Sequence, residues 1–255
     1  DVRAYIEHRQ SNGVGPATIN RELGLLSAAI NWAKRDLEWQ LQNPVMGRRL
    51  RPPEGRLRWL SRQEADRLID AARTYSRAEY LVDFIELALH TGMRRGEMLE
   101  LEWQRVDLDE GLVYLRGVHQ KNGKTGSVPL NETAKAALVR RDEFRQENCP
   151  SSPWVFAHKD GGRIASVKKS FANACARAGI KDFRIHDLRH CCAAWLVQSG
   201  VSIRAVAELL RHSDIRVTMR YAHLAPETVR AAVAVLDTES RSGHGVDFEE
   251  RARGG

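Results

Sequence analysis

Hydrophobic residues in the first fifty positions recur at the spacing of a helix. They fall at steps of four, three, four and three, at Ile19, Leu23, Leu26, Ile30 and Ala33. This stripe predicts a helix over residues 16–39, and Pro16 stands in its first turn, where proline is tolerated. The opposite face carries Arg21, Lys34 and Arg35, which suits either a solvated surface or a surface that contacts nucleic acid.

A basic segment, RRLRPPEGRLR at residues 48–58, interrupts the hydrophobic pattern. Its arginines are Arg48, Arg49, Arg51, Arg56 and Arg58. Because Pro52, Pro53 and Gly55 break helices and few apolar residues remain, the segment is expected to be a linker. It is either a solvated connector or a linker that lies along a phosphate backbone of DNA. The predicted domains on its two sides are residues 1–47 and 59–237.

The second domain begins with a helix start signal. Ser61 and Glu64 have the spacing of a capping box. Downstream, the apolar residues from Leu81 to Leu89 predict an amphipathic helix that ends at Thr91 and Gly92.

Residues 105–163 change character. They contain short β-rich runs separated by Asn122-Gly123 and Gly161-Gly162, which predict a small antiparallel sheet. Helical periodicity returns at Val167 and continues to about Leu236, and the polar, glycine-rich tail at residues 238–255 is expected to be disordered. The predicted fold is therefore mainly α with a small antiparallel β-sheet, an α+β class.

Composition narrows the possible partners and compartment. A formal net charge of +7 favours a polyanion such as nucleic acid, although a merely basic soluble enzyme is the alternative. Four cysteines form no disulfide framework, and no apolar run is long enough to span a membrane, so we expect a cytoplasmic, nucleoid-associated protein. The chain begins with Asp1, and we expect it to be a fragment or a processed form.

The heptapeptide HDLRHCC at residues 186–192 allows two kinds of chemistry. On a helix, His186 and His190 have the i, i+4 spacing of a metal clamp, whereas His186 and Arg189 have an i, i+3 spacing that suits a phosphate. Asp187 is expected to orient a neighbouring side chain.

The metal interpretation needs further ligands. Cys191 or Cys192 would have to complete a zinc site, and the other cysteines, Cys149 and Cys175, have no C-x-x-C partner. We therefore expect no metal or other cofactor, and we interpret His190 and the adjacent cysteines as helix packing.

Three further segments carry candidate chemistry. In TGMRRGE, Arg94 opens a helix beside free N–H groups and Glu97 can orient it, although a surface ion pair is the alternative. Lys121 and Lys124 flank the Asn-Gly turn, and a hairpin lysine either donates a proton or only adds solubility. Lys124 is also a candidate DNA contact.

The last of these segments is LLRHSDIRVTMRYAHL at residues 209–224. His212 follows a helix end, Ser213 is placed to cap the next short helix, and Tyr221 lies nine residues beyond His212. Tyr221 is either a packing residue or a nucleophile.

Six of these residues occur in one order along the chain: Arg94, Lys121, His186, Arg189, His212 and Tyr221. In this order, TGMRRGE, HDLRH, LLRHS and MRY resemble the conserved boxes of the tyrosine recombinases, the phage-integrase family. The resemblance covers residues 56–236, and residues 1–50 resemble the second half of the family's helical core-binding domain. Two positions depart from the family pattern. Arg211 replaces the usual glycine and is expected to alter helix packing or to add a phosphate contact, and Cys191 replaces the usual threonine as a tolerated packing change.

The resemblance implies a site-specific DNA recombinase that needs neither metal nor ATP. Arg94 and Arg189 would stabilise the charge on the phosphate oxygens, and Tyr221 would form a 3′-phosphotyrosyl bond. Lys121 would protonate the leaving oxygen. His186 would act as a base or a phosphate donor, and His212 would donate to a non-bridging oxygen.

The resemblance also implies partners. The first is double-stranded DNA with attachment-type sites, which the two domains would hold between them. The second is accessory DNA-bending proteins. The protein itself would be the integrase of a phage or mobile element. The protein would be a monomer alone and a homotetramer on two duplexes, and residues 227–236 would dock on a neighbouring protomer or on their own domain. The alternatives are a type IB topoisomerase, a DNA-binding regulator with a decayed site, and a zinc-dependent nuclease.

Overall fold

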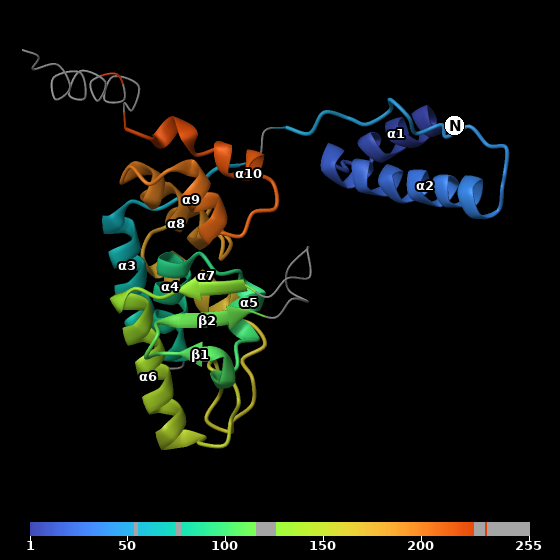
Figure 1. The fold of residues 1–255 in the computed structure, drawn as a ribbon. Helices are drawn as coiled ribbons and strands as arrows, with labels where there is room; N and C mark the ends of the chain where they lie inside the picture. The colour runs from blue at the N-terminus through green and yellow to red at the C-terminus, as the bar shows by residue number, and fades with distance from the viewer. Residues whose placement is uncertain (54–55, 75–77, 116–125, 227–232, 234–255) are drawn as a thin grey trace, which may run out of the picture. The chain divides into compact units, whose positions relative to one another are not determined.

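The computed structural model describes residues 1–53, 56–74, 78–115, 126–226 and 233. They belong to two compact units, Asp1–Leu57 and Arg58–Gly255, which are described separately below (Figure 1). The predicted tail at residues 238–255, and all of residues 227–236 except Val233, lie outside the described residues.

The first unit is a pair of helices, α1 (Val2–Ser11) and α2 (Pro16–Asp36). Ile6, Ile19, Leu23 and Val45 form its small core. Helix α2 begins at Pro16 as predicted but ends at Asp36, three residues before the predicted end at residue 39. The predicted apolar stripe is only partly covered, because Leu26 is 42% exposed while Ile19 and Leu23 are fully buried.

The second unit contains most of the chain. Its longer helices are α3 (Arg62–Arg73), α4 (Tyr80–Thr91), α6 (Glu132–Asn148), α7 (Lys168–Arg177) and α8 (Asp187–Gln198). Its shorter helices are α5 (Arg95–Leu99), η2 (Trp103–Arg105), α9 (Ile203–Leu209), α10 (Arg216–Met219) and η4 (Ala222–Leu224). Its strands are β1 (Val106–Asp107), β2 (Leu112–Leu115) and β3 (Gly126–Pro129).

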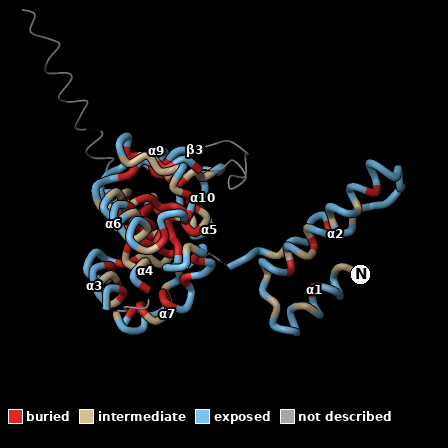
Figure 2. The backbone as a smooth tube through the Cα atoms, turned by 90° about the horizontal axis from the view of Figure 1, so that it is seen from below, coloured by how far each residue is buried: buried red, intermediate tan, exposed pale blue. Residues whose placement is uncertain are grey.

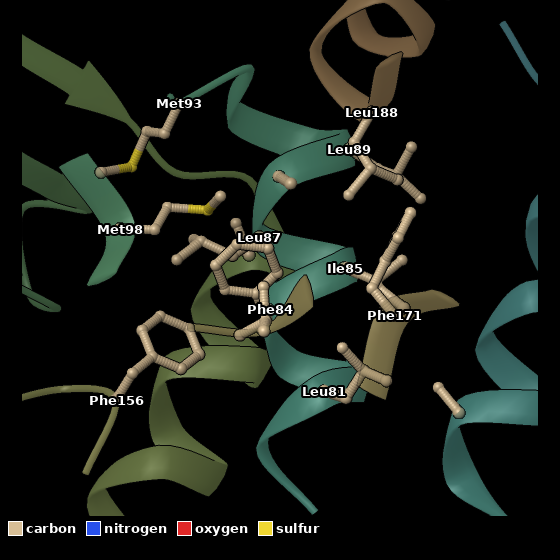
Figure 3. Close-up of a cluster of buried hydrophobic side chains, with 14 of the residues drawn as sticks. Leu81, Phe84, Ile85, Leu87, Leu89, Met93, Met98, Phe156, Phe171 and Leu188 are labelled. Atoms are coloured by element: carbon tan, nitrogen blue, oxygen red, sulfur yellow. The ribbon is translucent and has the colours of Figure 1, made fainter. Parts of the chain in front are cut away.

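Helix α4 lies at the centre of this unit and packs against α3, α6 and α8. Figure 3 shows the apolar cluster around it, in which the Phe84 ring meets the Phe156 ring edge to face with centroids 5.5 Å apart. Buried residues accordingly concentrate inside this unit (Figure 2). Burial of this surface is the main driving force for folding. Within the described residues, no helix combines the length and apolar character needed to cross a bilayer.

The sheet is antiparallel with strand order β1-β2-β3, which confirms the predicted α+β class. Val113 of β2 pairs with Val128 of β3, and both side chains are buried against the helices, while Tyr114 faces outward. Residues 116–125, the predicted hairpin with Lys121 and Lys124, lie outside the described residues.

Helix α6 lies within the region that the sequence pattern assigned to β-rich runs, so the prediction is wrong there. This helix buries only Ala134, Ala137, Leu138 and Arg141, which gives weak apolar periodicity. The buried Arg141 side chain forms an ion pair with Asp83 of α4, with Nη1 3.7 Å from a carboxylate oxygen.

Candidate active site

Arg189, in the first turn of α8, is the most buried of the site's arginines. Its side chain is buried, and its Nη1 donates to the main-chain oxygen of Gly92 at 2.5 Å. Its Nη2 donates to the main-chain oxygen of Leu210. Burial, followed by the charges of Arg94 and Arg211, lowers the pKa of Arg189, but a guanidinium remains charged in proteins. Two carbonyl groups from different elements therefore fix its orientation.

The C-terminal end of α9 supplies carbonyl groups to both candidate arginines. Arg211 has a left-handed backbone with φ of +56°, and the N–H groups of Arg211 and His212 bond back to Glu208 and Ala207. This geometry closes the helix, and it favours glycine. The oxygen of Arg211 accepts from Nη2 of Arg94 at 3.4 Å, as that of Leu210 accepts from Arg189. One helix end thus positions two guanidinium groups.

Glu97 connects Arg94 with Arg211. Its Oε1 accepts from Nη1 of Arg94, while its Oε2 accepts from the main-chain N–H of Arg94 and from Nη2 of Arg211, all at 2.7 Å. Burial favours a higher pKa for Glu97, but the charges of Arg211 and Arg94 outweigh it and hold the pKa below its ordinary value. Glu97 is therefore an ionised, buried carboxylate shared by two arginines.

Arg211 was the departure from the family pattern for which we expected altered helix packing or a phosphate contact. Its side chain is only 9% exposed and points back to Glu97. Its Nε has no hydrogen-bond partner within the described part of the chain. The residue therefore brings a third guanidinium to the site.

The two candidate histidines adjoin these arginines. Burial, followed by the charge of Arg189, lowers the pKa of His186 below its ordinary value and that of His212 to about 4. Both rings are therefore neutral at neutral pH. Nδ1 of His212 lies 2.7 Å from Oγ1 of Thr218, which is fully buried. Asp187, predicted to orient a neighbour, accepts from the main-chain N–H of Arg184 at 2.8 Å.

Tyr221 lies between α10 and η4, and it is 1% exposed. Its hydroxyl forms a hydrogen bond with Nδ1 of His190. Burial raises the pKa of Tyr221 to about 12, although the charges of Arg220 and Arg189 act in the opposite direction. The positive charge of Arg189 therefore favours the ionised form of the Tyr221 hydroxyl.

The structure corrects two sequence interpretations in this region. His190 does more than pack its helix, because it contacts the Tyr221 hydroxyl. Ser213 does not cap the following helix, because the N-cap of α10 is Ile215 and the Asp214 carboxylate accepts from the Arg216 N–H at 2.9 Å. Both outcomes depend on how the chain folds after residue 209.

His190 is the functional candidate that sequence reasoning missed, whereas Arg211 was noted as a departure but not placed beside Glu97. The i, i+4 spacing of His186 and His190 was a signal, since their rings lie 5.0 Å apart. For Arg211 the signal was the arginine at a glycine position of the family pattern. Among the described residues, no three His, Cys, Asp or Glu side chains gather in a group that could hold a metal ion.

Apart from Lys124, which lies outside the described residues, the predicted DNA-contacting residues fall into two groups. Arg21, Lys34, Arg35, Arg48, Arg49, Arg51 and Arg56 are exposed in the first unit. Arg58 differs, because it belongs to the second unit, where its guanidinium pairs with Glu64 at 2.7 Å and lies 6.0 Å from the Phe183 ring centroid. Glu64 also accepts from the Ser61 N–H, which completes the predicted capping box.

Comparison with known proteins adds to this geometry. The sequence profile of the phage integrase family matches residues 58–228. The chain belongs to the phage integrase family. It is 33% identical over 235 residues to the integrase of Salmonella phage P22, covering 87% of this chain and 58% of that protein. Tyrosine recombinase XerD of Caulobacter vibrioides is 31% identical over 240 residues, which cover 89% of this chain and 77% of that protein.

Solved structures show the same integrase fold. The catalytic domain of bacteriophage HP1 integrase is 28% identical, with a TM-score of 0.55 over 70% of this chain and 95% of that chain. The Tn1549 transposon integrase in complex with circular intermediate DNA is 19% identical, with a TM-score of 0.76 over 92% of this chain and 85% of that chain. The predicted family and fold class are thus confirmed, while the present chain spans little more than half of the P22 integrase.

Proposed function

We propose that this member of the phage integrase family cleaves and rejoins duplex DNA at specific sites through a covalent 3′-phosphotyrosyl intermediate. The observation that carries the proposal is the end of α9, where the carbonyl groups of Leu210 and Arg211 hold the guanidinium groups of Arg189 and Arg94. His212 follows directly in the chain, and the Tyr221 hydroxyl lies in the field of Arg189.

The arginines are suited to a phosphodiester in its transition state, where charge builds up on the non-bridging oxygens. Each terminal nitrogen of a guanidinium carries two hydrogens. In Arg189 the carbonyl groups of Gly92 and Leu210 each take one, so one hydrogen on each nitrogen remains for a phosphate oxygen. Donors fixed in this way stabilise developing charge without reorganising during the reaction.

The neutral histidines add hydrogen-bond donors. In the tautomer in which Nδ1 of His212 accepts from the Thr218 hydroxyl, Nε2 carries the hydrogen and donates to a non-bridging oxygen. His186, at the N-cap of α8, is assigned the same kind of contact.

The chemical step exchanges one phosphoester bond for another. The Tyr221 oxygen bonds to phosphorus as the bond to the 5′ oxygen breaks, and Lys121 is proposed to protonate that leaving oxygen. Because the tyrosyl ester preserves the bond energy, a DNA hydroxyl can reverse the exchange without ATP. Neither step requires a metal ion.

We assign the exposed basic residues of α2 and the linker to phosphate contacts, by the resemblance given above. Neutralised phosphates release counterions, so affinity should fall steeply with salt. The combined variant Arg48→Gln, Arg49→Gln, Arg51→Gln should flatten that dependence. An unchanged slope would remove the linker from the DNA interface.

We propose that the protein acts in the cytoplasm on nucleoid DNA, with attachment-type sites and accessory DNA-bending proteins. Four protomers would join two duplexes, whereas the free protein would be a monomer. Light scattering of the protein alone and with cognate duplex tests this assembly. A stable tetramer without DNA, or a complex that never exceeds one protomer per duplex, would contradict it.

The test of the chemistry does not need a known target sequence. A pool of nicked duplexes with a randomised segment is incubated with protein in EDTA, and covalent adducts are resolved on a denaturing gel. The wild type should trap DNA, and Tyr221→Phe should not. Tyr114→Phe, which changes an exposed tyrosine of β2, should trap DNA like the wild type. Equal trapping by Tyr221→Phe would remove Tyr221 as the nucleophile.

A further inference from the structure

His190 is the side chain that meets the Tyr221 hydroxyl. The two residues are 31 positions apart in sequence, one on α8 and the other after α10, and the hydrogen bond joins His190 Nδ1 to the phenol oxygen. Their ring centroids lie 6.0 Å apart with the planes tilted by 46°. In the tautomer with hydrogen on Nε2, the Nδ1 lone pair accepts the phenol hydrogen.

Other potential bases near the phenol are engaged elsewhere. Nδ1 of His212 meets Thr218, and a carboxylate oxygen of Asp187 accepts from the main chain at Arg184. The His186 ring packs edge to face against the His190 ring, with the two ring centroids 5.0 Å apart. Within the described part of the chain, His190 is thus the one base in hydrogen-bond contact with the nucleophile.

We infer that His190 accepts the hydroxyl proton of Tyr221 when the phenol attacks the scissile phosphate, and returns it when the strand is resealed. This inference rests on the proposed function. The O–H bond of Tyr221 breaks, its proton passes to Nδ1, and the freed electron pair bonds to phosphorus. The bond from phosphorus to the 5′ oxygen breaks, and that oxygen leaves with its electron pair and takes a proton from Lys121.

The electrostatic surroundings fit an acceptor that is neutral at rest. The groups that act on His190 are His186, Asp187 and Arg189 of α8, together with Arg220. Burial, followed by His186, lowers the pKa of His190 to about 4, so its lone pair is available at neutral pH.

The nucleophile also needs a base. With a pKa of about 12, Tyr221 ionises negligibly without one. A bound phosphate would bring negative charge next to the imidazolium that forms, which favours transfer at the moment of attack.

A matched pair of variants separates proton transfer from positioning. In His190→Asn, the amide oxygen occupies the place of Nδ1 and accepts the phenol hydrogen bond but cannot take the proton, whereas His190→Leu loses both. Single-turnover adduct formation is measured with duplexes recovered from the trapping pool. We expect His190→Asn to be slower by about 10²-fold at neutral pH. The deficit should narrow as pH rises, because hydroxide then removes the phenol proton.

A change of leaving group separates the role of His190 from that of Lys121. A 5′-bridging phosphorothioate releases a thiolate, which needs no protonation. On this substrate the deficit of Lys121→Ala should disappear, and that of His190→Asn should persist. The exposed His158 is the control, since His158→Asn should match the wild type on both substrates.

A spectroscopic measurement tests the same inference without a substitution at His190. Nitrogen NMR of labelled histidine should show His190 as a neutral ring with hydrogen on Nε2, and Tyr221→Phe should shift its Nδ1 resonance. Hydrogen on Nδ1 would overturn the inference, as would a His190→Asn rate within about twofold of the wild type. If the wild type forms no Tyr221-dependent adduct at all, the proposed function fails instead.

Discussion

At the scale of single residues, Arg94 and Arg189 form the proposed phosphate clamp. The fixed orientation of their guanidinium groups distinguishes this clamp from an ordinary basic patch. Arg189 is buried and bonded through both terminal nitrogens to main-chain oxygens, so its remaining hydrogens point in fixed directions. Arg94 is held similarly by Glu97 and by the oxygen of Arg211. Lysine cannot reproduce this arrangement, because an ammonium on a flexible stem has no planar fork.

Arg189→Lys should therefore lose at least ~10²-fold in the rate of adduct formation while retaining DNA affinity. Affinity is measured by fluorescence anisotropy and the rate by trapping. The control is Arg163→Lys, at an arginine that is 38% exposed and pairs with Glu100. Normal turnover in Arg189→Lys would rule out the clamp.

Single-residue chemistry was partly accessible from the sequence. The order of Arg94, His186, Arg189 and Tyr221 identified the family, because each motif has local spacing. The contact between His190 and Tyr221 was not predictable, since 31 residues separate them and the fold of α9 and α10 brings them together.

At the scale of elements, two helix ends build the site. Helix α4 ends at Gly92, whose left-handed backbone turns the chain toward α5 and whose oxygen anchors Arg189. Helix α9 ends at the left-handed Arg211. The sequence predicted the first end, since glycine marks it, whereas an arginine gives no local signal for the second.

Helix α6 shows the limit of pattern reading. Its buried face consists of two alanines, one leucine and Arg141, so periodicity is weak along the sequence. The stabilising partner of Arg141 is Asp83, on α4. Hydrophobic spacing does not predict a helix whose buried face includes a charged residue paired with a distant element.

Gly92→Ala tests the role of the first helix end. An added Cβ would lie 2.3 Å from Cδ2 of Leu210, at a backbone φ of +60°. The left-handed strain and the overlap should together cost about 2–4 kcal/mol of unfolding free energy. Urea denaturation measures this cost. Gly96→Ala is the control, since its Cβ would meet nothing within 4 Å, and it should be neutral or slightly stabilising. Equal stabilities would contradict the packing argument.

At the scale of the whole molecule, the second unit brings three arginines and three neutral histidines close to one another, since the charges of Arg189, Arg94 and Arg211 all act on His212. The pKa values of His186, His190 and His212 are all lowered, chiefly by burial. This arrangement prepares the site for a polyanion. It also has a cost, because protonation of these rings opposes folding.

Stability should therefore fall as pH is lowered. The unfolded chain binds protons at the ordinary histidine pKa of about 6.5, and folded His190 and His212 do so only near about 4. The melting temperature should drop across this window, and His190→Asn combined with His212→Asn should reduce the drop. His158→Asn should leave it unchanged, because that ring is exposed. The same pH dependence in the double variant would contradict the assignment.

The most direct test of the account is to locate the covalent bond. Adducts trapped by the wild type are digested with nuclease and trypsin and analysed by mass spectrometry. Cleavage after Arg220 and Arg230 releases the peptide YAHLAPETVR, which begins with Tyr221. The account predicts a nucleotide 3′-phosphate on the Tyr221 oxygen of that peptide. A nucleotide on any other residue, or an adduct in which this peptide is unmodified, would contradict it.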